Sequence, residues 1–110
     1  MSELDFDPVL HPPARLQIAA ILAKVDDVEF AVIKDLVEVS DSVLSKHLSA
    51  LNQAGYVRLE KAKRDGRQRT WASFTAKGRK AFAAHVRALQ ILASAAENPV
   101  AAEKQMRGFT

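Results

Sequence analysis

The sequence predicts an α+β domain that is mostly helical, and three observations support this prediction. Apolar residues recur every three or four positions in four separate segments, which is the period of an amphipathic helix. Before the last of these segments, residues 57–74 alternate like paired strands around an Asp-Gly turn signal. The chain has 110 residues, of which 48% are hydrophobic, so it has room for one core and one domain.

Composition excludes several other classes of protein. No run of 18 apolar residues is present, which argues against a membrane-spanning helix. The first residues, MSELDFDPVLHPP, are acidic and lack the apolar stretch of a signal peptide. Without any cysteine, the chain has no disulfide and no thiolate metal site. We therefore expect a cytoplasmic protein that has no membrane partner.

The chain divides into three expected parts. Residues 1–11 form an irregular lead-in, residues 12–97 form the folded domain, and residues 98–110 form a disordered tail that contains Pro99. The first helix begins at Pro12 or Pro13, because a proline fits the first turn of a helix. A short DDVEF segment then makes a turn with a one- or two-residue strand, and Phe30 to Val37 form a second helix.

A third helix is expected from about residue 41 to residue 54. Ser40 is a suitable N-cap, and Gly55 is suited to the left-handed position that ends a helix. Leu44, Leu48 and Leu51 fall on one side. The opposite side carries small polar groups, one lysine and two amides: Ser42, Ser45, Lys46, Ser49, Asn52 and Gln53.

A hairpin and a long helix complete the predicted fold. The hairpin covers about residues 57–74, and the basic residues beside Asp65-Gly66 suggest a loop longer than two residues. Thr75 caps the final helix, which ends before Pro99. A two-stranded hairpin is not stable alone, so it must pack on the three preceding helices. This order of elements is a winged helix–turn–helix, with a three-helix core, a two-stranded wing and a long C-terminal helix.

Three linked motifs also resemble a known family. The runs SVLSKHLSALNQAGYV, EKAKRDGRQRTW and FTAKGRKAF together resemble the winged-helix DNA-binding domains of transcription regulators, close to the MarR and ArsR types. LSKHL…L…AGYV resembles their recognition helix and its exit into the wing, and FTAKGR is similar to the Leu-Thr-x-x-Gly-Arg junction after the wing. The resemblance covers roughly residues 10–92 and implies binding to double-stranded DNA.

The chain departs from both types of regulator. ArsR-type sensors carry a Glu-Leu-Cys-x-Cys metal motif, whereas this chain has EFAVI in that region and no cysteine. Full-length MarR proteins have additional helical sequence around this core. No metal and no cofactor are therefore predicted, and a small-molecule effector is possible but not indicated.

The distribution of charge along the chain supports DNA binding. Residues 1–40 hold three basic and eight acidic side chains, whereas residues 58–80 hold nine basic and two acidic ones. Such segregation creates a local positive field. We expect the third helix to enter the major groove and the wing to contact the backbone or the minor groove. The predicted DNA-binding residues are Ser42, Ser45, Lys46, Ser49, Asn52, Gln53, Lys63, Arg64, Arg67 and Arg69.

Each of these features also has a simpler interpretation. The serine-rich face can be a solvated helix surface, and the arginines a charged loop that keeps the protein soluble. Asp41 would repel a phosphate, so we interpret it as stabilising the start of the helix. The alternative function is a winged-helix protein-interaction module that uses the hairpin or the final helix.

The final helix is longer than a core of this size can cover, so we expect a homodimer. Two copies would present two recognition helices about one DNA turn apart. The predicted dimer interface contains apolar residues from the first helix, the segment before it and the final helix: Leu10, Leu16, Phe82, Val86, Leu89 and Leu92.

The histidines indicate no catalytic or metal site. His11, His47 and His85 are 36 and 38 residues apart, which matches no local ligand spacing. We expect His47 to be partly buried and to donate to a backbone carbonyl, and His85 to pack inside the fold or at the dimer interface. No nucleophile with a base, carboxylate pair or glycine-rich phosphate loop is present, so the sequence does not predict an enzyme.

Overall fold

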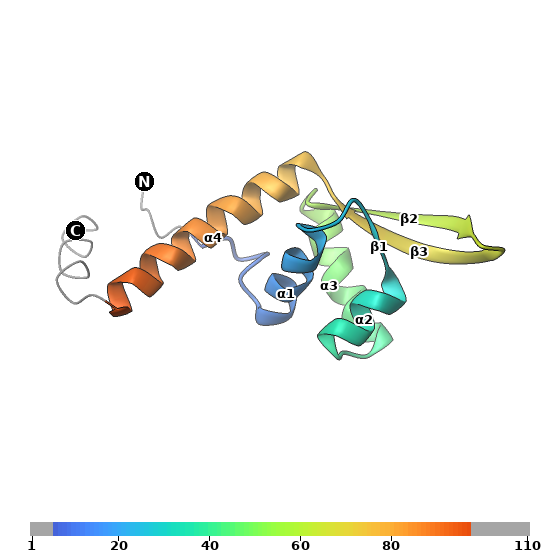
Figure 1. Cartoon of the computed structure of the whole chain (residues 1–110), viewed down its shortest axis with the longest axis horizontal. Helices are drawn as coiled ribbons and strands as arrows, with labels where there is room; N and C mark the ends of the chain where they lie inside the picture. Colours follow the sequence, from blue (N-terminus) through green and yellow to red (C-terminus); the bar gives the residue numbers. More distant parts are fainter. Residues whose placement is uncertain (1–5, 98–110) are drawn as a thin grey trace.

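The computed structural model describes residues 6–97. They form α1 (Pro13–Leu22), β1 (Val28–Glu29), α2 (Phe30–Val37), α3 (Asp41–Gln53), β2 (Val57–Arg64), β3 (Arg67–Phe74) and α4 (Ala76–Glu97), as Figure 1 shows. The predicted fold class, a mostly helical winged helix–turn–helix, is confirmed. Residues 6–11 form turns. The predictions for residues 1–5 and 98–110 lie outside the described residues.

The strands form one antiparallel sheet in the order β1-β3-β2. Val57 pairs with Phe74 at the root of the hairpin, and Arg64 pairs with Arg67 at its tip. Asp65 and Gly66 therefore make a two-residue turn, with φ values of 53° and 78°. The expectation of a longer loop was wrong, because Asp-Gly tolerates the two left-handed conformations that this tight turn requires.

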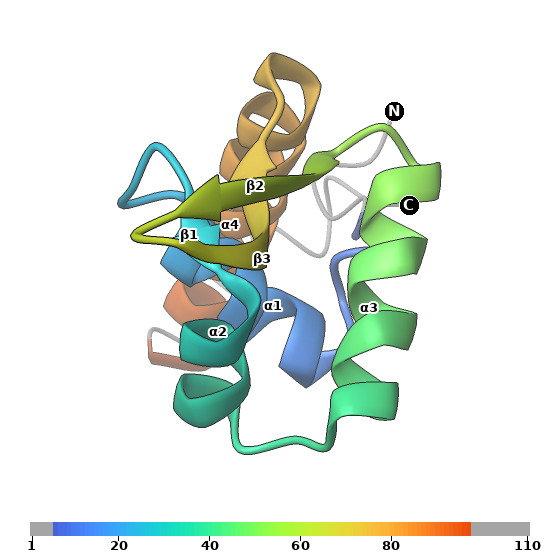
Figure 2. The same cartoon turned by 90° about the vertical axis from the view of Figure 1, so that its right-hand side faces the viewer.

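The core lies between α1, α3 and the root of the sheet. Leu44, Leu48 and Leu51 of α3 are buried, as their spacing predicted. They belong to one apolar cluster with side chains from the lead-in, α1, α2 and the sheet: Leu10, Ile18, Ala19, Leu22, Val28, Ile33, Val57, Ala72 and Phe74. Figure 2 shows α3 along one side of the molecule, next to α1.

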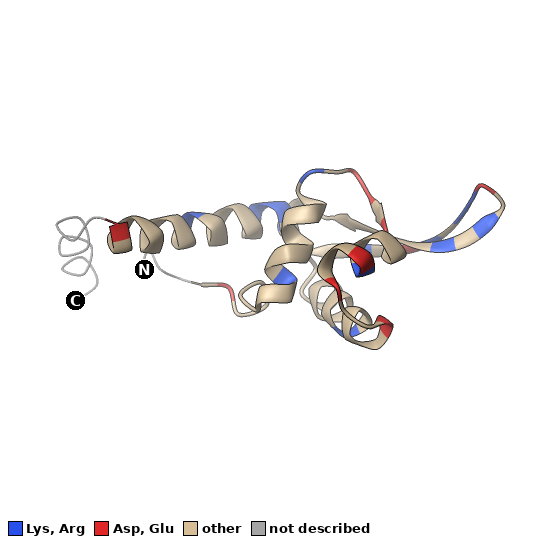
Figure 3. Ribbon diagram, turned by 60° about the horizontal axis from the view of Figure 1, so that its bottom comes forward, with Lys and Arg blue, Asp and Glu red and all other residues tan. Residues whose placement is uncertain are grey.

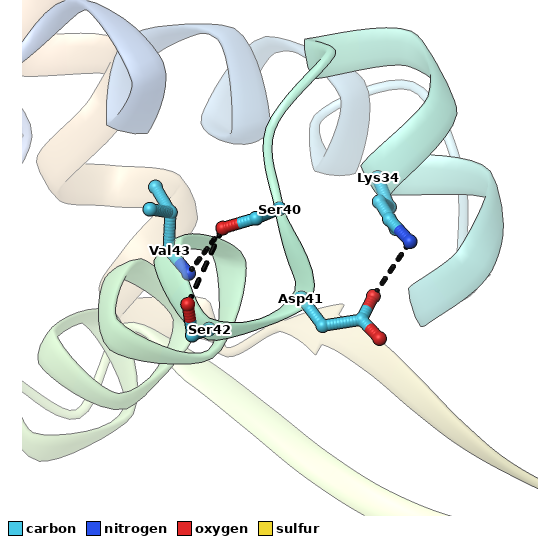
Figure 4. A network of polar contacts seen from close by, with 5 residues as sticks. All are labelled: Lys34, Ser40, Asp41, Ser42 and Val43. Carbon is cyan, nitrogen blue, oxygen red and sulfur yellow. Dashed lines mark hydrogen bonds and ion pairs between the residues drawn. The ribbon is translucent and has the colours of Figure 1, made fainter.

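The turn between α2 and α3 is fixed by local contacts, which Figure 4 shows. Ser40 is the predicted N-cap: its hydroxyl accepts a hydrogen bond from the backbone N–H of Val43 at 3.2 Å. Asp41 forms an ion pair with Lys34 of α2 at 2.9 Å, in addition to its place at the positive end of the α3 dipole. These contacts cap the start of α3 and link it to α2.

The junction between β3 and α4 explains the FTAKGR motif. The hydroxyl of Thr75 donates to the carbonyl of Gly55 at 2.6 Å and accepts from the N–H of Gly78 at 3.0 Å. A Cβ at Gly78 would lie 2.1 Å from the carbonyl oxygen of Tyr56, so any other residue would require the backbone to shift. Arg79 donates to the carbonyls of Ala23 and Val25. The motif thus joins α4 to the end of α3 and to the loop after α1.

The molecule is elongated, with principal extents of 58 × 24 × 22 Å. The wing and the far end of α4 project in opposite directions from the central helices (Figure 1). A DNA-facing surface at the wing and an intermolecular surface on α4 would therefore not compete for space.

Candidate nucleic-acid interface

The outer side of α3 is exposed over its whole length. All six predicted contact residues of this helix are exposed: Ser42, Ser45, Lys46, Ser49, Asn52 and Gln53. Two of them have partners within the chain. Asn52 donates to the backbone carbonyl of Val57 at 2.9 Å, and the Ser42 hydroxyl lies 3.3 Å from that of Ser40. Asn52 therefore also stabilises the turn into β2.

The register of the hairpin divides the wing into two faces, because successive side chains of a strand point to opposite sides. One face carries Val57, Leu59, Lys61 and Lys63 together with their cross-strand partners. We call it the inner face, because its root is packed on the helices. The outer face carries the other set, namely Arg58, Glu60, Ala62, Arg64, Arg67, Arg69, Trp71 and Ser73.

The inner face and α3 border the same pocket, which has a volume of about 240 Å³. Ser45 and Ser49 line it from α3, and Leu59 and Thr70 line it from the wing. Lys61 pairs with Thr70 in the hairpin register and is exposed, so it lies one step beyond the pocket on the same side. The exposed polar face of α3 thus continues into the lysines of the wing.

Lys61 was not among the predicted contact residues. The signal was present in the sequence, since the alternation of Val57 and Leu59 extends to Lys61 and Lys63. Proximity to the Asp-Gly turn is a weaker guide than this alternation, because the tip arginines belong to the outer face.

Two predicted contact residues on the outer face are occupied within the chain. Arg64 folds back over Trp71, with 3.8 Å between its guanidinium carbon and the ring centroid, and pairs with Asp27 at 2.8 Å. The hydrogen bond that Arg64 donates to Asp27 raises the pKa of Arg64 above its ordinary value. Arg69 pairs with Glu29 of β1 at 2.8 Å. To contact DNA, either arginine must exchange a carboxylate for a phosphate.

Basic residues are concentrated on the wing, as Figure 3 shows, where one acidic residue marks the turn. Lys46, Lys61, Lys63 and Arg67 are exposed and form no ion pair among residues 6–97. These four cations are therefore not neutralised by an ion pair within the described residues. The pair of Lys34 and Asp41 lies at the start of α3 and is neutral as a whole.

His47 is partly buried, but its expected bond to a backbone carbonyl was wrong. Its Nδ1 accepts a hydrogen bond from Nε of Arg15 at 3.1 Å, so the ring serves as an acceptor. Burial, followed by the charge of Arg15, lowers the pKa of His47. In the described part of the chain, no group of three or more His, Cys, Asp and Glu residues is arranged to hold a metal ion.

The predicted dimer residues differ in what they leave available to a partner. Leu10 is 0% exposed inside the core of its own chain, so it has no surface for a second copy. Leu16 is half-buried, and Phe82 packs near Phe74 with ring centroids 6.0 Å apart. Leu92 on the projecting half of α4 is 48% exposed, and Val86 and Leu89 are half-buried.

A winged-helix domain is the class that this fold defines, and comparison with known proteins agrees. A family model described as a winged helix DNA-binding domain matches residues 14–93, and the chain belongs to this family. The chain is 32% identical over 74 residues to the uncharacterized protein MJ0432 of Methanocaldococcus jannaschii, a match that covers 67% of this chain and 80% of that protein.

Solved structures share the fold. A transcriptional regulator homologue from Pyrococcus horikoshii has a TM-score of 0.76 at 23% identity, over 82% of this chain and 89% of that chain. A MarR-family regulator from Silicibacter pomeroyi has a TM-score of 0.63 at 20% identity, over 93% of this chain and 62% of that chain. These likenesses show a shared fold, and the family to which the chain belongs is that of winged helix DNA-binding domains.

No helix among residues 6–97 combines the length and the apolar character that a membrane crossing requires.

Proposed function

We propose that the chain is a homodimeric transcription regulator that binds duplex DNA through α3 and the wing. The observation that carries this proposal is the continuous surface formed by the exposed side of α3 and the inner face of the wing. Its hydroxyl groups border one pocket, and its lysines lie on the same side. Family membership supplies independent support.

In this proposal α3 occupies the major groove. Ser45 and Ser49 are short, so the helix backbone can approach the base edges closely. Lys46 reaches a guanine or a phosphate, while Gln53 reaches a base or the backbone. Serine hydroxyls carry little sequence information alone, so they mainly fix the position of the helix on the phosphates.

The wing then lies beside the adjacent phosphate backbone. Lys61 and Lys63 face the strand that passes between α3 and the wing, and Arg67 at the tip reaches the backbone or the minor groove. Arg64 and Arg69 join after they leave Asp27 and Glu29. Both ion pairs are partly exposed, so they contribute little stability and exchange readily for phosphate.

A homodimer would place two such surfaces on one DNA molecule. The projecting half of α4 supports this part of the proposal, because the helix extends away from the other helices (Figure 1) and Leu92 is exposed. The interface we propose contains Leu16, Phe82, Val86, Leu89 and Leu92, without the buried Leu10.

A salt titration of binding to arbitrary duplex DNA tests the DNA contacts. The logarithm of affinity should fall linearly with the logarithm of salt concentration, and each lost phosphate contact should reduce the slope by about 0.9. We expect Lys61→Ala and Lys63→Ala each to cause this reduction. Arg87→Ala is the matched control, because Arg87 is exposed on α4, which projects away from the wing.

Two results would contradict the proposal. One is the absence of any affinity for duplex DNA at low salt. The other is an unchanged slope in the double variant Lys63→Ala, Arg67→Ala. A slope that falls in the double variant and equally in Arg87→Ala would show a diffuse charge effect in place of the proposed surface.

The second candidate function is a protein-interaction module without sequence-specific DNA binding. The exposed Leu92 favours it, since this apolar side chain can contact a different protein as well as a second copy. The salt titration separates the two functions, because only the DNA-binding protein has affinity for arbitrary duplex at low salt.

A further inference from the structure

Residues 6–11, which we call the N-terminal strap, are held in place by polar contacts as well as by Leu10. The Asp7 carboxylate accepts hydrogen bonds from its own backbone neighbours, the N–H groups of Val9 at 2.8 Å and Leu10 at 3.4 Å. It also accepts from the hydroxyl of Tyr56 at 2.5 Å. The strap thus connects to the chain just after α3.

The strap connects to α4 through one buried ring. His85 is 1% exposed and is the buried polar residue of the described core. Its Nδ1 accepts a hydrogen bond from the backbone N–H of Asp7 at 2.9 Å. Its Nε2 lies 3.3 Å from Nδ1 of His11. The ring of Phe6 stacks on His11, with 5.0 Å between the centroids, and packs edge-on against His85 at 5.6 Å.

This geometry fixes the protonation state of His85. A backbone N–H can only donate, so Nδ1 of His85 must carry a lone pair. The proton of the neutral ring is then on Nε2, where it donates to Nδ1 of His11. An Nε2 that carries a proton cannot bind a metal, so the two facing rings form a hydrogen bond and not a metal site.

We propose that His85 and the N-terminal strap form a pH-sensitive latch, in which the neutral ring holds the strap on α4 and protonation of the ring releases it. A second proton on His85 must occupy Nδ1, where it faces the N–H of Asp7. Two donors then oppose each other at 2.9 Å, and the hydrogen bond between strap and helix is lost.

The charged groups around His85 favour the neutral ring. Burial, followed by the proximity of His11, lowers the pKa of His85, and the Asp7 carboxylate opposes this effect. That carboxylate is already engaged by Tyr56 and by two backbone N–H groups. On the α1 side, Arg15 donates to the carbonyl of Val9 and to His47. Among the described residues, no other side chain forms a hydrogen bond or ion pair with His85.

The sign of the pH dependence follows from the lowered pKa. Where the docked ring has a lower pKa than the released ring, the released state binds more protons at acidic pH. The latch is therefore closed above the ordinary histidine value of 6.5 and weakens as the pH falls below it. Tyr56 follows α3 and donates a hydrogen bond to Asp7 of the strap. Release of the strap therefore also removes the link between α4 and the end of α3.

Hydrogen exchange and NMR of the full chain between about pH 8 and pH 5 test the latch. After correction for intrinsic exchange rates, protection of the amides of Val9, Leu10 and His11 should fall with acidification. The fall should be about tenfold for each unit by which docking lowers the pKa of His85. Amides in the centre of α3, such as that of Leu48, should keep their protection.

A matched pair of variants identifies the titrating group. In His85→Asn the side-chain oxygen still accepts from Asp7 but does not titrate in this range, so the pH step in the strap should disappear. In His47→Asn the step should remain. A wild-type His85 that titrates at or above 6.5, strap protection that does not change with pH, or a step that persists in His85→Asn would each overturn the proposal. None of these results depends on DNA binding.

Discussion

Gly78 has little freedom to change, because the backbone of Tyr56 fills the space beside it. A Cβ there would lie 2.1 Å from the Tyr56 carbonyl oxygen and 2.9 Å from a ring carbon of Phe74. Close packing therefore explains why a glycine stands inside a helix, where alanine has the higher helix propensity. This reason becomes visible only when the end of α3 is brought against the start of α4.

Gly78→Ala should destabilise the protein by about 2 kcal/mol. Overpacking against backbone costs up to about 3 kcal/mol, and the better helix propensity of alanine returns about 1 kcal/mol. Urea unfolding followed by the fluorescence of Trp71, the only tryptophan, measures the change. Ala84→Gly on the exposed side of α4 is the control for propensity alone. A Gly78→Ala variant as stable as the wild type would contradict the packing argument.

Tyr56 offers a second test at the scale of one side chain, because it is the only tyrosine. The hydrogen bond to Asp7, with help from burial and the charge of Asp7, raises its pKa to about 12. Asp7→Asn should move this pKa back toward the ordinary value of 10.0, as measured by tyrosinate absorbance.

The same shift sets a pH window for stability. The folded pKa is raised, so the stabilisation is complete below pH 10.0 and is lost as the pH rises toward about 12. Asp7→Asn should reduce this alkaline loss. A tyrosinate midpoint unchanged by Asp7→Asn would show that the carboxylate does not hold the phenol.

The wing is the element whose structure was partly predictable. Alternating residues and the Asp-Gly turn predicted both strands, and spacing alone predicted the buried leucines of α3. The two outer-face ion pairs were not predictable, because Arg64 lies 37 positions from Asp27 and Arg69 lies 40 positions from Glu29. A local pattern contains no information on which distant carboxylate a surface arginine meets. The contact between His85 and the strap was hidden for the same reason.

Asp27→Asn should strengthen binding to duplex DNA by about twofold to fivefold, the range expected for an exposed ion pair. The change frees Arg64 from its carboxylate and lets it contact a phosphate, so the salt slope should also become steeper by about 0.9. Fluorescence anisotropy with a labelled duplex measures both quantities. Asp26→Asn removes the neighbouring exposed charge as a control, and equal gains in the two variants would contradict a specific role for Arg64.

At the scale of the whole molecule, the two ends of the chain's long axis carry different surfaces. The basic wing projects at one end and α4 at the other (Figures 1 and 3). This separation allows DNA binding and self-association to be tested independently.

Leu92→Lys should shift the protein toward monomer and leave the fold intact. Leu92 is 48% exposed in one chain, so a lysine there costs the monomer little but places a charge in the proposed interface. Light scattering at micromolar concentration should give about twice the mass of one chain for the wild type and a lower mass for the variant. A wild-type mass equal to that of one chain would contradict the homodimer.

The two-residue strand β1 has a mechanical consequence. It pairs with β3 through Val28 and Glu29, and α2 begins at the next residue, Phe30. Through β1, the wing is therefore hydrogen-bonded to the segment that begins α2, the helix before α3. A change in the angle of the wing would have to move α2 as well. We expect the angle between α3 and the wing to be preset in the free protein. A duplex would then be selected by how readily its grooves deform to fit this fixed angle between α3 and the wing.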